Sequence, residues 1–141
     1  MKNLTLPGRP LLFICATLLF SSCATNSWTS RCGPGEQPAV MDSLYFGTAK
    51  PGGEVTAAEW QRFVATVITP RFPKGITSWN ASGQWQNAAG RLERENSHVV
   101  HIVHAASSDA DKAIREIIAD YKKRFRQEAV LRVRSPACIS F

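Results

Sequence analysis

The stretch that decides the fold is LERENSHVVHIVHA, residues 92–105. Side chains alternate between the two faces of an extended strand, so neighbouring positions report on opposite faces. Val100 and Ile102 point to one face, while Val99 and Val103 point to the other. Apolar residues on both faces are typical of a strand inside a sheet rather than at its edge. We therefore expect residues 92–105 to form a central strand.

Two helices flank this strand in the sequence. Thr56 and Glu59 form a capping box, in which each side chain accepts a hydrogen bond from a free backbone N–H at a helix start. Proline removes a backbone donor and disfavours helical geometry in the residue before it, so we expect this helix to end at Pro70 and Pro73. A second helix is expected to begin at Ser108, because apolar residues then recur at three-and-four spacing.

Three further strands complete the predicted order of elements. They are expected at residues 41–47, 75–86 and 129–134, and Pro136 should end the last of them. The order strand, helix, strand, strand, helix, strand, with right-handed crossovers, predicts an α+β ferredoxin-like fold, the split βαβ or βαββαβ arrangement. Its antiparallel four-stranded sheet has the order fourth, first, third, second, with two helices on one face. We expect this domain to span residues 41–141.

The N-terminal stretch LLFICATLLFSSC, residues 11–23, indicates the destination of the protein. After a basic start, an apolar run leads through two small residues into Cys23, a pattern that resembles a bacterial lipoprotein signal. Phe20 departs from it, since leucine is commoner at that position. The run is much shorter than the about 20 residues of a membrane-spanning helix. We expect residues 1–22 to be a signal peptide and residues 23–40 a tether lipidated at Cys23.

The same resemblance implies a location in the cell envelope. Ala24 follows the cysteine where aspartate would signal inner-membrane retention, which implies an outer membrane lipoprotein facing the periplasm. The alternative is ordinary signal cleavage, which would give a soluble periplasmic or secreted protein. The net charge of +6 is too small and too dispersed to indicate nucleic-acid binding. The expected partner is therefore the membrane, reached through the lipid anchor, and not a nucleic acid.

The four cysteines are assigned by this destination. Cys15 is removed with the signal, and Cys23 carries the lipid. Cys32 and Cys138 remain in an oxidising compartment, where we expect them to form a disulfide. The alternative is a pair of free buried thiols. The predicted topology favours the bond, because it places the start of the first strand beside the end of the fourth.

Four motifs and a closing cysteine resemble an uncharacterised family of small exported bacterial proteins. The motifs are LYFG at residues 44–47, TPRFP at 69–73, GQW at 83–85 and RFRQEAVLR at 124–132. That family is known as a domain of unknown function, often with a lipoprotein signal. The resemblance implies an exported setting for residues 44–141 and supplies no catalytic residues.

Three histidines, at positions 98, 101 and 104, raise the question of a metal site. Residues three apart in a strand lie on opposite faces, and His98 and His104 would lie about 20 Å apart along one face. Three such side chains do not converge on one ion. We therefore expect no metal site and no cofactor.

The remaining candidates lie on the face of the sheet that no helix covers. Alternation assigns Tyr45, His101 and Arg132 to this open face, and Trp79 and Trp85 are expected to join them. An exposed aromatic face is usually covered by something. We expect a homodimer or the chain's own TPRFP loop to cover it. The functional interpretation is a pocket that holds an anionic or aromatic small molecule.

Two functions are compatible with these observations. The first is a cell-envelope lipoprotein that acts as a non-enzymatic binding or interaction module. The second is a small periplasmic enzyme that uses His101 as acid or base, with Tyr45 and Arg132 orienting a substrate. The sequence does not name the ligand or substrate of either.

Overall fold

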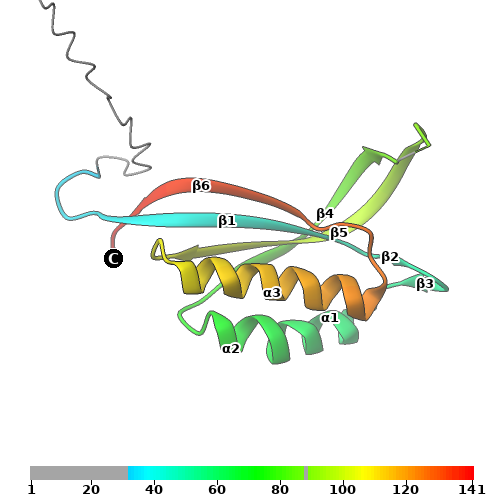
Figure 1. Ribbon diagram of the computed structural model, residues 1–141, viewed down its shortest axis with the longest axis horizontal. Coiled ribbons are helices and arrows are strands. Elements are labelled where there is room, and N and C mark those ends of the chain that lie inside the picture. Colours follow the sequence, from blue (N-terminus) through cyan, green and yellow to red (C-terminus); the bar gives the residue numbers. More distant parts are fainter. Residues whose placement is uncertain (1–31, 88) are drawn as a thin grey trace, which may run out of the picture.

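The computed structural model describes residues 32–87 and 89–141, and a four-stranded antiparallel sheet organises them (Figure 1). Its strands are β1 (Gln37–Gly47), β4 (Thr77–Gln86), β5 (Leu92–His104) and β6 (Leu131–Ile139). They lie in the order β4-β5-β1-β6. The predicted strand order is confirmed, and the stretch that begins at Leu92 is an inner strand as its apolar pattern indicated.

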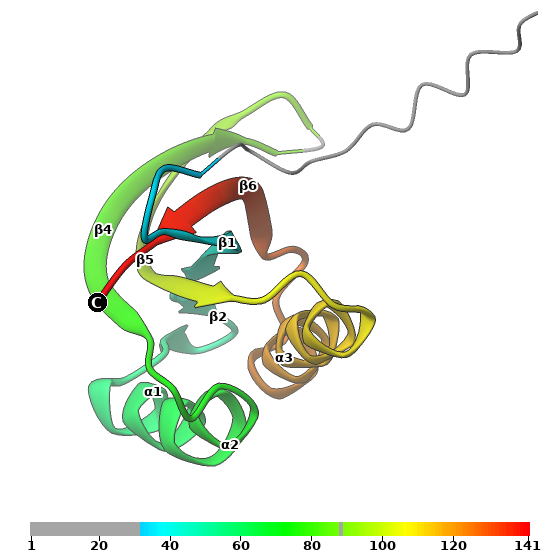
Figure 2. The ribbon, with the colours of Figure 1, turned by 90° about the vertical axis from the view of Figure 1, so that its left-hand side faces the viewer.

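The helices form one layer on one face of the sheet (Figure 2). They are α1 (Ala57–Phe63), a π-helical turn η1 (Val64–Ile68), α2 (Thr69–Arg71) and α3 (Ser108–Phe125). The α+β ferredoxin-like fold is therefore confirmed. Figure 2 also shows that the sheet is strongly curved, so that β4 bends around one side.

The hydrophobic core lies between the sheet and the helices. Leu44 and Phe46 of β1 are fully buried there, as are Val100 and Ile102 of β5. Tyr121 of α3 packs against Phe46, with ring centroids 4.7 Å apart, and its hydroxyl donates a 2.8 Å hydrogen bond to the carbonyl of Gly47. Burial raises the pKa of the Tyr121 phenol, with the nearby carboxylates of Glu95 and Glu59 adding to the effect.

The first helical segment begins as predicted and ends later. Thr56 caps α1, and both hydrogen bonds of the capping box with Glu59 are present. The prediction that helical geometry fails before Pro70 was wrong, because Thr69 is helical and α2 continues to Arg71. The π-helical turn explains this: the Thr69 N–H bonds to the carbonyl of Val64. Pro70 then occupies the first turn of α2, where its missing donor costs little.

Two strands are longer than the sequence predicted. β1 begins at Gln37, and β6 passes through Pro136 instead of ending before it. Pro136 is tolerated because β6 is an edge strand, so its missing N–H need not serve a neighbour. The expected loop between the first strand and the first helix also contains a short hairpin, β2 (Ala49–Lys50) with β3 (Gly53–Glu54).

A disulfide joins Cys32 to Cys138, which confirms the predicted pairing. It ties the start of the domain to β6, and beside it Pro38 of β1 pairs with Cys138. The predicted signal peptide, the lipidation site Cys23 and the tether up to residue 31 lie outside the described residues. Within the described part of the chain, no helix is long and apolar enough to cross a membrane.

Candidate functional site

The three histidines of β5 lie in three different environments. His98 pairs with Phe46 of β1 and His104 pairs with Val40, so both share the helix-covered face. His101 pairs with Ser43 and lies on the open face. The three side chains therefore do not converge, in agreement with the sequence argument against a shared ion.

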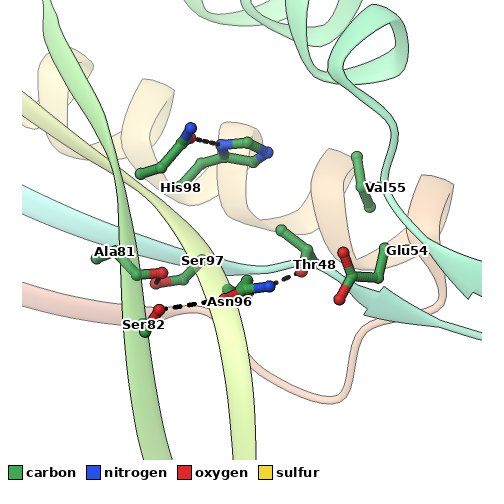
Figure 3. A pocket seen from close by; sticks show the side chains of 9 residues that line it. Thr48, Glu54, Val55, Ala81, Ser82, Asn96, Ser97 and His98 are labelled. Atoms are coloured by element: carbon green, nitrogen blue, oxygen red, sulfur yellow. Dashed lines mark hydrogen bonds between the residues drawn. The ribbon is translucent and has the colours of Figure 1, made fainter.

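A polar pocket of about 300 Å³ lies beside His98 (Figure 3). It occupies the space between the β4–β5 hairpin, which projects away from the helix layer (Figure 1), and the segment around the β2–β3 hairpin. Its lining residues are Thr48, Glu54, Val55, Asn80, Ala81, Ser82, Asn96, Ser97 and His98. In size it suits a small molecule.

His98 is held firmly at this pocket. Its ring stacks on the indole of Trp60, with centroids 4.3 Å apart and planes 9° apart. Nδ1 lies 2.8 Å from Oδ1 of Asn80. An amide oxygen can only accept, so Nδ1 carries the hydrogen and Nε2 of the neutral ring is an acceptor.

The second ring nitrogen of His98 has no partner. Nε2 is covered from solvent and makes no hydrogen bond to any residue that the structure describes. Burial lowers the pKa of His98, because the charged ring would lose solvation without gaining a carboxylate. His98 is therefore a neutral imidazole at pH 7, with an unused basic nitrogen at a pocket.

The rest of the pocket wall is polar and partly bonded to itself. The Ser82 hydroxyl lies 3.1 Å from Oδ1 of Asn96, and the Thr48 hydroxyl donates to the backbone carbonyl of Asn96. Glu54 is exposed at the rim. The arrangement can hold a small polar molecule through several directed hydrogen bonds.

This pocket was not predicted from the sequence, although the sequence contains a signal for it. In a strand whose inner face is apolar, positions 80, 82, 96 and 98 should carry apolar side chains. They carry asparagine, serine, asparagine and histidine instead. Polar residues at core-facing positions of a hairpin mark the place where the core ends and a polar cavity begins.

The opposite end of the helix-covered face holds a network of charges around Asp42. This carboxylate is fully buried. Oδ1 and Oδ2 accept from Nε and Nη2 of Arg132 at 2.7 and 2.9 Å, and Nε2 of His104 lies 2.8 Å from Oδ2. Burial alone would raise the pKa of Asp42, but the bonds from Arg132 and then His104 outweigh it and lower the pKa below its usual value.

His104 is fully paired in this network. Its Nδ1 lies 2.8 Å from the carbonyl of Ala105, so both ring nitrogens face acceptors. Arg132 also donates from Nη1 to Asp111 at the start of α3, at 2.7 Å. The network therefore links β1, β5 and β6 to α3. Its charged groups are paired with one another and are not available to a ligand.

The placement of Arg132 on the open face was wrong. It pairs with buried Leu44 and points to the helix side, toward Asp42. The physical reason is the buried carboxylate, which needs a bidentate cation beside it. The alternate apolar residues of the strand, Leu131 and Val133, consequently lie exposed on the open face.

The other open-face candidates do share that face. Tyr45 and Trp79 both pair with Val99 across β5, and both remain partly exposed. The Trp79 and His101 rings meet edge to face with centroids 4.6 Å apart. Trp85 lies farther along the projecting hairpin, opposite Glu93. These side chains form an apolar surface, and neither described pocket lies among them.

The TPRFP segment does not cover this face. Arg71 within it bonds to Glu116 and Asp120 of α3, which places the segment in the helix layer. The suggestion that this loop closes the open face was therefore wrong.

Two other places in the described residues bring together groups that could bind a ligand. Cys32, Glu36 and Cys138 bring potential metal ligands together, but the two cysteines are joined in a disulfide and offer no thiolate. A second hollow, of about 430 Å³, contains Glu59 and Lys50. The ammonium of Lys50 and then Thr56 lower the pKa of Glu59 to about 2, so these charges already satisfy each other.

Comparison with known proteins identifies the family. The model of a protein of unknown function, DUF3574, matches residues 41–141. The chain belongs to this family. The expectation of an uncharacterised domain family is thereby confirmed, and no curated protein matches the chain.

Two solved structures with a similar fold are phage proteins. A phage SAM lyase in complex with S-methyl-5'-thioadenosine aligns with a TM-score of 0.57 and 15% identity, over 79% of this DUF3574 chain and 95% of that chain. A phage SAM lyase in its apo state aligns with a TM-score of 0.53 and 16% identity, over 80% and 95%. At these identities the likeness shows the fold alone.

Proposed function

We propose that this DUF3574 protein is a cell-envelope lipoprotein whose domain binds a small polar molecule, without chemistry, in the pocket beside His98. Lipidation at Cys23 would hold the domain at the outer membrane, facing the periplasm. The Cys32–Cys138 disulfide supports an oxidising compartment, because such bonds persist outside the cytoplasm.

The observation that carries the binding proposal is the unpaired Nε2 of His98. A buried polar atom without a partner costs about 1–3 kcal/mol, so proteins rarely retain one without a use. A ligand with a suitable donor would recover that cost. The His98 ring is already fixed between Trp60 and Asn80, so the ring itself loses little conformational freedom when a ligand binds.

The similar solved structures lend limited support to this proposal. The phage SAM lyase is described in complex with a small molecule, S-methyl-5'-thioadenosine. This supports the idea that a domain with this arrangement of strands and helices can hold a small ligand. It does not transfer that ligand to this chain.

Binding can be tested with a fragment library and amide NMR spectra. Small polar fragments should shift the signals of Thr48, Asn80 and Asn96 selectively, and His98→Phe should reduce those shifts. His101→Phe is the matched control, because it makes the same change on the same strand but on the open face. If no fragment shifts pocket signals, or if both variants behave alike, the pocket is not the binding site.

The lipoprotein part of the proposal needs a separate test. Cells that express the full chain should incorporate labelled palmitate into the protein and carry it in the outer membrane fraction. Cys23→Ala should lose the label. Unlabelled wild-type protein that is recovered in the soluble periplasm would instead support ordinary signal cleavage.

An enzymatic function is a second candidate, and under it His98 replaces His101 as the candidate acid or base. His101 was expected to be the acid or base, but Arg132 lies on the opposite face and cannot assist it. His98 is the better base, since its ring is neutral and Asn80 fixes its tautomer. Under this proposal, turnover of a fragment-like substrate would disappear in His98→Gln and persist in His101→Gln.

We also propose that two copies of the domain associate through the open face. Along β1 and β6 this face presents Met41, Tyr45, Leu131 and Val133. None of these is charged, so this part of two identical faces would not repel each other. Sedimentation should show a dimer that Leu131→Lys dissociates, while Gln61→Lys, an equal charge change on exposed α1 surface, leaves it intact.

A further inference from the structure

The charge of the His98 pocket differs from that of the whole chain. The protein carries a net charge of +6, yet none of the described residues that line the pocket is a lysine or an arginine. With His98 neutral, Glu54 is the one formal charge in that lining. A phosphate or carboxylate would therefore find no cation to pair with in the pocket.

The hydrogen bonds of the pocket wall point to the same class of ligand. The hydroxyl hydrogens of Thr48 and Ser82 are directed at oxygen atoms of Asn96. The amide nitrogens of Asn80 and Asn96 are donors in the same lining, whereas the carboxylate of Glu54 and Nε2 of His98 are acceptors. A ligand that reaches Glu54 and His98 must therefore donate hydrogen bonds to them.

We propose that the pocket takes a small cationic amine, with its ammonium group toward Glu54 and a hydrogen-bond donor on His98 Nε2. This inference rests on the proposed binding function and specifies the ligand for it. Because Nε2 is covered in the free protein, neighbouring side chains shift when the donor reaches it.

Three probes of equal length test the charge preference. They are 4-amino-1-butanol, 1,4-butanediol and 4-hydroxybutanoate, which are cationic, neutral and anionic at pH 7. Titrations followed by amide NMR should show that the amine binds about tenfold more tightly than the acid, with the diol between them. Glu54→Gln should weaken the amine about threefold and leave the diol unchanged.

The pKa of the His98 ring gives a second readout. A donor on Nε2 stabilises the neutral ring, so the amine should lower the pKa of His98 further, as measured from the ring carbon signals. The uncharged diol should lower that pKa in the same direction, which separates the hydrogen bond from the repulsion that an ammonium group alone exerts on the charged ring. An anion beside the ring would raise that pKa instead. His98→Phe should weaken all three probes, whereas His101→Phe should weaken none.

The possible results separate this inference from the function on which it rests. Equal binding of the three probes, tightest binding of the acid, or a raised pKa of His98 would overturn the amine specificity and leave the pocket as a binding site. The absence of any shift in Thr48, Asn80 and Asn96 at high millimolar concentrations of all probes would overturn both.

Discussion

His98 and His104 lie on the same face of the same strand, near opposite ends of the helix-covered surface, and their surroundings differ completely. Both ring nitrogens of His104 lie within hydrogen-bond distance of a partner, Asp42 and the Ala105 carbonyl, within a charge network that also contains Arg132. His98 has one partner, Asn80, and an unused nitrogen beside a pocket. At the His104 end of the sheet the buried polar groups are paired with one another. At the His98 end a polar group has no partner and can bind a ligand. The difference separates groups that stabilise the fold from groups that can serve a ligand.

The largest expected effect comes from removing the centre of the paired end. Asp42→Ala leaves Arg132 and His104 buried without their shared carboxylate, which should lower the free energy of unfolding by about 3–5 kcal/mol. Urea unfolding at pH 7 measures it. Glu116→Ala, which removes an exposed acid paired with Arg71, should cost less than about 1 kcal/mol. If both variants lost the same free energy of unfolding, the buried network around Asp42 would contribute no more to stability than an exposed ion pair.

Reduction of the disulfide, which lies near the His104 end of the sheet, should lower the free energy of unfolding by a smaller amount. Cys32 and Cys138 are 106 positions apart, so their bond restricts a long loop of the unfolded chain. Breaking it should lower the free energy of unfolding by about 2–4 kcal/mol. Unfolding with and without reductant measures this, and a Cys32→Ser, Cys138→Ser double variant should show no response to reductant. A fold whose stability is unchanged by reduction would contradict the prediction.

His104→Phe should cost about 1–3 kcal/mol of unfolding free energy. The new ring cannot donate, so Oδ2 of Asp42 and the Ala105 carbonyl each lose a hydrogen bond. Urea unfolding at pH 7 provides the value. A variant as stable as the wild type would mean that water or Arg132 alone satisfies Asp42.

His98→Phe should have the smallest effect at pH 7, within about 0.5 kcal/mol or stabilising, because it keeps the stacking on Trp60 and removes the unpaired nitrogen. The difference should appear in acid. The folded-state pKa of His98 is lowered, so as the pH falls through about 6.5 the unfolded chain takes up a proton that the folded chain does not. Wild-type stability therefore falls with pH until the folded-state pKa is reached.

Unfolding curves between about pH 8 and pH 5 check this sign. The stability of His98→Phe should depend less steeply on pH than that of the wild type. His101→Phe, on the open face, should keep the wild-type slope. A steeper slope in His98→Phe would show that the ring is stabilised in its charged form and is not the neutral acceptor described above.

The fold could be predicted from the sequence because its strands and helices carry clear periodicity. Apolar residues on both faces of the stretch around Val100 determined the inner strand, and the capping box at Thr56 determined a helix start. The errors fell at prolines. Whether Pro70 ends a helix depends on a π-helical turn before it, and whether Pro136 ends a strand depends on its edge position. Neither condition is local in the sequence.

The candidate site was less predictable, for a different physical reason. The alternation of side chains along a strand predicts which residues share a face, but it does not predict which of the two faces is buried. The apolar Leu131 and Val133 suggested that Arg132 faced outward, whereas buried Asp42 requires it inside. The sequence contained a warning, since Asp42 shares its alternation with core residues Leu44 and Phe46. Likewise, the environment of His98 depends on Trp60 and Asn80, which come from two other elements.

The covalent bond between Cys32 and Cys138 also bears on mechanics. A pull applied to the chain before Cys32 is transmitted at once to β6 as well as to β1, because the bond couples the two strands where they pair. The load therefore acts on two adjacent strands together and does not peel β1 away from the sheet one hydrogen bond at a time. Under the proposal that Cys23 is lipidated, a pull on the lipid anchor would load β1 and β6 together.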